Sequence, residues 1–154
     1  MNKIFISKEF YWNMAHILSD HKGLCKNLHG HTYRMQVQIS RKNKGLLQNT
    51  LHSDGMVIDF SDLKDIVQKK FIDPLDHAFM HWRNSNDPVE HQIAELLKNN
   101  GKKVITVNYR PTVEEIALNF FAELSRELHK NDIIVESIRI WETAASYAEV
   151  TRED

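Results

Sequence analysis

The sequence lacks several features that would assign it to a specialised class of protein. Its single cysteine, Cys25, excludes an internal disulfide bond and suits a reducing cytoplasm, and residues 1–8 lack the apolar stretch of a signal peptide. No hydrophobic run exceeds three residues, which excludes a transmembrane helix. Lys and Arg number 20 and Asp and Glu 21, so the net charge is −1. This balance argues against nucleic acid or an anionic membrane as a partner.

The residues that are present fit one globular domain. The 154 residues are close to the roughly 150 of a typical domain, and 42% of them are hydrophobic and 27% charged. No internal repeat, low-complexity tract or domain boundary interrupts the sequence. We therefore expect a single domain over residues 1–154, located in the cytoplasm.

Two stretches of the sequence alternate hydrophobic and polar residues. Between residues 2 and 16 the hydrophobic side chains fall on even positions, and between residues 29 and 40 they fall on odd positions. A period of two is typical of a strand that is buried on one face only. We expect the two strands to pair as an antiparallel ribbon, with residues 17–28 as the connection.

Helix signals occupy the middle of the sequence. Ser61 can cap a helix that ends near residues 73–74, and Asp87 followed by a proline is a good start for a second helix. Thr112 and Glu115 form a capping box before the most strongly amphipathic segment. The predicted fold class is α+β, with strands first, helices in the middle and strands last. Further strands are expected over residues 103–107, 133–142 and 145–150.

Three histidines share one face of the predicted ribbon. His29 and His31 are two residues apart on one strand, so both point to the same side, and His16 continues the hydrophobic parity of the other strand. Three converging neutral imidazoles form an open, catalytic kind of zinc site. The alternative is a set of hydrogen-bonded histidines near the end of a sheet. The shared parity of all three favours a metal site.

Cys25 lies four residues before His29 in a polar loop, and two roles compete for it. It can be a fourth zinc ligand that closes a structural site, or a nucleophile or base beside the metal, with its thiolate favoured by the cation. An inert thiol is the third alternative. The spacing alone does not separate the first two.

Asp76 and His77 are adjacent, directly after the break at residues 73–74. Neighbouring Asp and His side chains on a loop can work as a proton relay, in which the carboxylate orients the imidazole. The more ordinary interpretation is an ion pair or a cap at a helix end, and the sequence alone favours that interpretation.

Glu142 continues the hydrophobic face of the strand predicted over residues 133–142. A carboxylate in that position is costly unless it is paired. Its partner can be an arginine such as Arg139 or Arg110. It can also be a ligand with two adjacent N–H donors, such as an aminopyrimidinone ring.

The chain resembles one known family, the 6-pyruvoyltetrahydropterin synthase family, in six short motifs that follow the family's order over nearly the whole sequence. The motifs are Met14–His16, Cys25–Tyr33, Gly55–Phe60, Leu75–His77, Pro111–Glu114 and Trp141–Thr143. The resemblance implies a tunnelling fold, an antiparallel four-stranded sheet with helices on one face. It also implies a homo-oligomer in which two trimers stack as a hexamer, with active sites that draw on more than one subunit.

The resemblance also implies roles for the candidate residues. Cys25 would be the catalytic base, with Asp76 and His77 as its partner pair, and Glu142 would anchor a pterin ring. The three residues between Cys25 and His29 look like the branch that makes 6-carboxytetrahydropterin for queuosine biosynthesis. The implied zinc ligands are His16, His29 and His31.

In that branch the substrate is 7,8-dihydroneopterin triphosphate, and the products are 6-carboxy-5,6,7,8-tetrahydropterin, acetaldehyde and triphosphate. The alternatives are a sibling enzyme with a pyruvoyl product or an aldolase-type cleavage, a zinc- or pterin-binding module without turnover, and a zinc-stabilised structural domain. Residues 82–109 form a longer stretch than compact family members have, and we expect it to add a helix and a strand.

Overall fold

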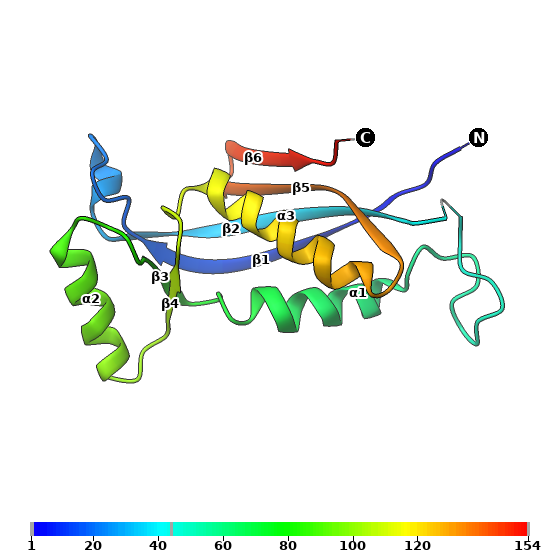
Figure 1. Cartoon of the computed structure of the whole chain (residues 1–154), viewed down its shortest axis with the longest axis horizontal. Coiled ribbons are helices and arrows are strands. Elements are labelled where there is room, and N and C mark those ends of the chain that lie inside the picture. Colours follow the sequence, from blue (N-terminus) through cyan, green and yellow to red (C-terminus); the bar gives the residue numbers. More distant parts are fainter. Residues whose placement is uncertain (1, 44, 154) are drawn as a thin grey trace.

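The structure is a computed structural model, and it describes residues 2–43 and 45–153. One sheet of six strands forms its centre, in the order β4-β3-β1-β2-β5-β6 (Figure 1). Short helical turns at Leu24–Lys26 and Gln68–Ile72 complete the elements. The strands are β1 (Ile6–His16), β2 (His29–Arg41), β3 (Ala78–Trp82), β4 (Val104–Val107), β5 (Ile133–Thr143) and β6 (Ser146–Thr151), and the helices are α1 (Phe60–Val67), α2 (Pro88–Asn99) and α3 (Val113–His129).

The sheet is larger than the four strands that the resemblance implies. β1, β2, β5 and β6 pair antiparallel, as expected. β3 joins the edge of β1 as a parallel strand, and β4 continues the sheet in parallel beyond β3. The added helix and strand expected within residues 82–109 are α2 and β4.

The β1–β2 ribbon carries the predicted alternation. The two strands pair over the whole of β1, and His16 lies directly opposite His29. One face of the ribbon is buried, with Trp12, Met14 and Tyr33 each at most 3% exposed. The histidines at the end of the ribbon therefore continue this buried face.

Helices α1 and α3 cover the buried face of the ribbon. Leu63 of α1 and Phe120 of α3 belong to the same hydrophobic core as the ribbon's side chains. The predicted cap at Ser61 is wrong, because the Ser61 N–H donates to the Asp59 carboxylate at 2.8 Å and Asp59 is the capping residue. Thr112 caps α3 as predicted, accepting the Glu115 N–H at 3.2 Å.

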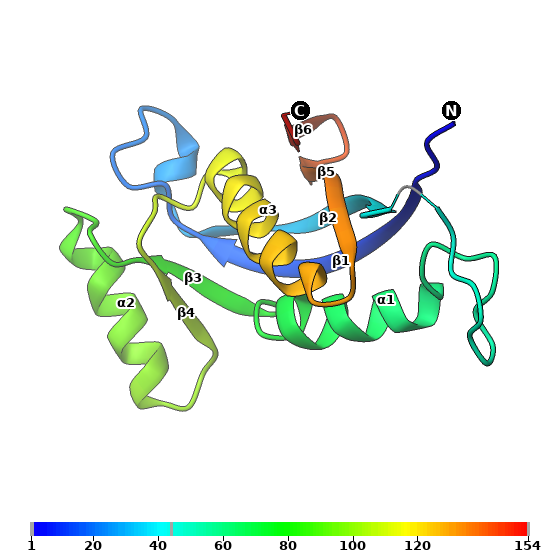
Figure 2. The same cartoon turned by 45° about the vertical axis from the view of Figure 1, so that its right-hand side comes forward.

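Helix α2 packs on the other face of the sheet. Ala94 of α2 contacts a small second core that includes Phe79 of β3. Phe79 alternates with Met80, which belongs to the main core, so the two cores lie on opposite sides of β3. Figure 2 shows α2 beside β3 and β4, apart from α1 and α3.

Three strand edges have no neighbouring strand within the described residues, and the outer edge of β4 is one of them. β3 pairs with β1 only at Met14–His16, so within the described residues no strand lies beside the outer edge of β1 from Ile6 to Trp12. β6 is the last strand at the opposite end of the sheet. Among the helices that the structure describes, none has the length and apolar character needed to cross a membrane.

Candidate metal centre

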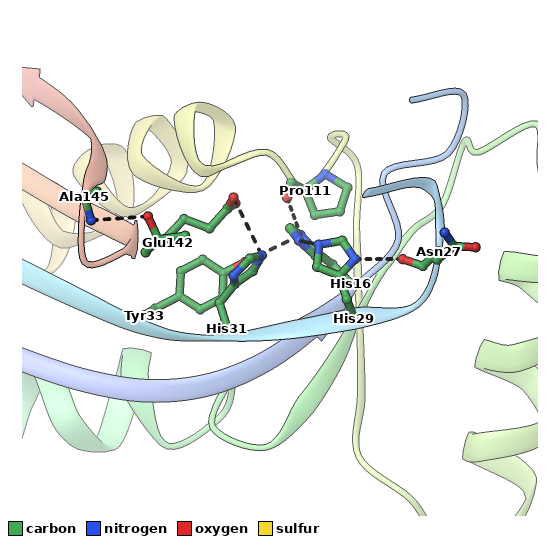
Figure 3. A network of polar contacts seen from close by, with 9 residues as sticks. His16, Asn27, His29, His31, Tyr33, Pro111, Glu142 and Ala145 are labelled. Carbon is green, nitrogen blue, oxygen red and sulfur yellow. Dashed lines mark hydrogen bonds and ion pairs between the residues drawn. The ribbon is translucent and has the colours of Figure 1, made fainter. Parts of the chain in front are cut away.

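Three histidines meet at the end of the β1–β2 ribbon. His16 is the last residue of β1, and His29 and His31 are the first and third residues of β2. One nitrogen of each ring lies within 4.8 Å of the corresponding nitrogens of the other two (Figure 3). The structure thus brings together the three residues that share one parity in the sequence.

Hydrogen bonds to backbone carbonyls determine which nitrogens of two rings are protonated. His16 Nδ1 lies 2.8 Å from the Pro111 carbonyl oxygen, and His29 Nδ1 lies 2.7 Å from the Asn27 carbonyl oxygen. A carbonyl oxygen only accepts, so each Nδ1 carries the proton. In the neutral rings each Nε2 then presents a lone pair.

These lone pairs face one another without a donor between them. His16 Nε2 and His29 Nε2 are 3.0 Å apart, and His31 Nε2 is buried without a hydrogen-bond partner. The histidines are therefore not a satisfied hydrogen-bond network. Converging imidazole nitrogens suit zinc and other divalent transition metals, and carbonyls behind the rings are the usual way of holding such ligands in orientation. The donor set fits a metal ion.

Burial favours the neutral form of two of the three histidines. Desolvation, assisted by the neighbouring His29 and His31, lowers the pKa of His16 from 6.5 to about 4. Burial also lowers the pKa of His31, although the nearby Glu142 carboxylate opposes the shift. His16 is consequently neutral near pH 7 and does not need to lose a proton to bind a metal ion.

Glu142 lies at the rim of the centre. It is near the end of β5, and its Oε1 atom lies 3.6 Å from His31 Nε2 (Figure 3). The arginine partners considered from the sequence are engaged elsewhere: Arg139 pairs with Glu149, and Arg110 donates to the Ser19 carbonyl. The Glu142 carboxylate, about one-fifth exposed, thus faces the histidines and remains open to a ligand.

Cys25 lies in the helical turn Leu24–Lys26 and is half-buried. Within the part of the chain that the structure describes, its thiol does not belong to the group of metal-ligating atoms formed by the three histidines. The geometry does not form the closed four-ligand site. The Cys25 carbonyl accepts the Leu18 N–H at 2.9 Å, which ties the cysteine loop to the chain just after His16.

Asp76 and His77 form a contact pair at the edge of β1. His77 Nδ1 lies 2.9 Å from Asp76 Oδ1, which also accepts the Asn13 N–H at 2.9 Å. The His77 side chain is 74% exposed and lines a shallow hollow together with Asn13, His31 and Thr32. Within the described residues the pair does not belong to the group of metal-ligating atoms that the three histidines form.

Comparison with known proteins assigns the chain to a family. Residues 5–153 match the family described as 6-pyruvoyl tetrahydropterin synthase. The chain belongs to this family. A relative from Haemophilus influenzae, named 6-carboxy-5,6,7,8-tetrahydropterin synthase, is 47% identical over 94% of this chain and 96% of its own length. An Aquifex aeolicus relative of the same name is 31% identical over 84% of this chain and 76% of its own length.

Solved structures agree with the family fold. An uncharacterised protein from Wolinella succinogenes superposes with a TM-score of 0.77 at 23% identity and covers 97% of this chain and 98% of its own. The 6-pyruvoyl tetrahydropterin synthase of Caenorhabditis elegans gives a TM-score of 0.62 at 20% identity over 99% of this chain and 98% of its own. These similarities confirm the predicted fold.

Sequence reasoning missed the groups that orient the histidines in this member of the 6-pyruvoyl tetrahydropterin synthase family. They are the backbone carbonyls of Pro111 and Asn27, and a backbone group leaves no mark in a residue pattern. Both residues lie inside motifs that carry the family resemblance. Their place inside these motifs is the one feature of the sequence that points to them.

Proposed function

We propose that the chain catalyses the reaction named in its bacterial relatives, as a zinc-dependent lyase. The substrate would be 7,8-dihydroneopterin triphosphate, and the products 6-carboxy-5,6,7,8-tetrahydropterin, acetaldehyde and triphosphate. The observation that carries the proposal is the convergence of three imidazole nitrogens beside an open carboxylate. The 47% identity to the Haemophilus influenzae protein supports this branch of the family.

His16, His29 and His31 would hold the zinc ion, with Pro111 and Asn27 orienting two of the rings. Three protein ligands are the number typical of a catalytic zinc site, in which the ion would also accept a group of the substrate. Zinc bound there supplies Lewis acidity, which lowers the pKa of the hydroxyl groups on the substrate's side chain.

Glu142 would orient the substrate. A carboxylate can accept two adjacent N–H groups from the aminopyrimidinone edge of a pterin, a charge-assisted pair of hydrogen bonds. Because Glu142 lies 3.6 Å from the His31 ring, a pterin held by it is kept next to the three histidines. The hydroxylated side chain of the substrate would then lie beside the three histidines.

Cys25 would act as the base that moves a proton on the side-chain carbon of the substrate. His77, oriented by Asp76 at 2.9 Å, would exchange protons on the other side of that carbon. Triphosphate leaves by elimination, one water molecule adds to the side-chain carbonyl carbon next to the ring, and a retro-aldol type of carbon–carbon cleavage releases acetaldehyde and leaves the carboxylate. Each protein group in this sequence only takes or returns a proton.

The placement of Asp76 and His77 supports an oligomer. Within the described residues of one chain this pair is not part of the group that the three histidines form, and its exposed imidazole would serve the site of a neighbouring copy. The open outer edges of β1 and β6 offer the surfaces through which copies can pair as one continuous sheet. We propose a hexamer built as a dimer of trimers, working in the cytoplasm.

Metal analysis and turnover together test the zinc site. The purified protein should contain about one zinc per chain, and His29→Ala should lose both zinc and turnover because two nitrogens cannot hold a tetrahedral ion well. The control is His52→Ala, which alters an exposed loop histidine and should change neither. Full zinc occupancy in His29→Ala would remove His29 from the site.

A further inference from the structure

Lys103 directly precedes β4, and its side chain reaches the loop that carries Asp76 and His77. Its ammonium group donates to the Asp73 carbonyl at 2.5 Å and to the Asp76 carbonyl at 2.6 Å. Its own carbonyl accepts the Phe79 N–H at 3.0 Å. Side chain and backbone of Lys103 thus both bind residues 73–79. The ammonium group has three N–H donors, enough to bind both carbonyls at once.

The backbone of His77 has an unusual conformation. Its φ of 64° is left-handed, which costs a residue other than glycine about 1–2 kcal/mol. Such a conformation persists only when the surroundings hold it in place. The holding contacts therefore decide where the His77 imidazole lies.

One peptide group decides the orientation of His77, and it is held at both ends. The Asp76 carbonyl of this group accepts from Lys103, and the His77 N–H on its other side donates to the Asn13 carbonyl at 2.6 Å. Rotation of this peptide group would change φ of His77. Asn13 fixes the N–H end from β1, and Lys103 fixes the carbonyl end.

We propose that Lys103 is a positioning residue for the Asp76–His77 pair. This inference rests on the proposed function, in which that pair transfers protons. It assigns a role in catalysis to the added segment of residues 82–109, which supplies Lys103 at the junction between α2 and β4. The ammonium group does not touch substrate in this scheme; it acts through the backbone of His77.

The test replaces Lys103 with Met, which keeps the length of the side chain and removes its donors. Lys103→Met should lower kcat roughly tenfold or more, because a displacement of a catalytic group by about 1 Å is enough for such a loss. KM and zinc content should stay unchanged, since neither the Glu142 rim nor the three histidines are altered. Lys103→Arg keeps a charged donor and should recover most of the activity.

Two further measurements separate positioning from general stability. Hydrogen exchange in residues 73–78 should speed up in Lys103→Met, because the His77 N–H loses its fixed geometry, and it should be unchanged in Lys102→Met. The Lys102 side chain makes no hydrogen bond or ion pair in the described part of the structure, so this variant is the matched control. A kcat for Lys103→Met within about twofold of wild type, or equal effects of the two variants, would overturn the proposal.

The exchange measurement does not depend on the reaction. If the wild-type protein does not consume the substrate, the proposed function fails, and unchanged exchange in Lys103→Met would separately show that Lys103 does not hold the loop. If turnover is normal and Lys103→Met only lowers the melting temperature, Lys103 is structural and the proposed function stands.

Discussion

Acid should destabilise the metal-free protein through His16. This side chain is fully buried, and burial lowers its pKa to about 4 from the 6.5 of an exposed histidine. The folded protein therefore keeps His16 neutral at a pH where the unfolded chain already binds the proton. Stability from the neutral ring is fully present above about pH 6.5 and is lost as the pH falls toward 4.

The size of the effect follows from the two pKa values. Each pH unit between them is worth about 1.4 kcal/mol, so the fall from 6.5 to about 4 amounts to roughly 3 kcal/mol of unfolding free energy. That is a large part of the roughly 5–15 kcal/mol that stabilises a typical domain. Metal-free protein should accordingly be much less stable near pH 4.5 than near pH 7.5.

Urea unfolding of metal-free protein across this pH range measures the effect. His16→Gln lacks the titrating ring, so its unfolding free energy should fall less steeply with acidification, and the wild-type curve should drop by up to about 3 kcal/mol more. Subunit concentration is kept constant, because oligomerisation shifts apparent stability. The exposed-loop variant His52→Gln should follow the wild type. Parallel curves for wild type and His16→Gln would refute the reasoning.

Two other predictions concern α2 and the shared active site. Glu90→Ala should lower the unfolding free energy by roughly 2–4 kcal/mol, measured by urea unfolding, because the buried Ser19 hydroxyl and Trp82 N–H both donate to this carboxylate. Glu95 is exposed on the same helix, so the unfolding free energy of Glu95→Ala should stay within about 0.5 kcal/mol of wild type. Equal losses of unfolding free energy in the two variants would show that the hydrogen bonds to Glu90 do not stabilise the fold. Protein with Cys25→Ala and protein with His77→Ala should each be inactive alone. When the two kinds of subunit are mixed at random, about a quarter of wild-type activity should return, because about that share of the sites combines an intact Cys25 with an intact His77. A mixture no more active than its components would contradict a site shared between copies.

The strand pattern of the ribbon was readable because one face of it is buried and the other is not. That condition places His16, His29 and His31 on one side by parity alone, and the structure agrees. β3 gave no such pattern, since four of its five residues are buried, with the main core on one side and α2 on the other. A strand covered on both faces has no polar side to mark its period.

The helix start at Ser61 shows a different limit. Asp59 and Ser61 are both good capping residues, and their order in the chain does not say which one stands outside the helix. The carboxylate of Asp59 accepts both the N–H and the hydroxyl of Ser61, so the earlier residue is the cap. Competition between two suitable residues is settled by three-dimensional geometry.

The candidate site was only partly readable. Side-chain chemistry identified the histidines, but the orientation of His77 depends on its left-handed backbone and on carbonyl contacts with Lys103. Neither has a signature in residue types. The sequence also did not show where the Asp76–His77 pair lies relative to the three histidines, because loop residues carry no parity.

The products formed from 7,8-dihydroneopterin triphosphate test the central claim most directly. Zinc-loaded protein is incubated with this substrate, acetaldehyde is assayed, and the pterin product is identified by mass. The proposed function predicts acetaldehyde and 6-carboxy-5,6,7,8-tetrahydropterin in equal amounts, together with triphosphate. A pyruvoyl-tetrahydropterin without acetaldehyde, or no consumption of the substrate by zinc-loaded protein, would contradict it.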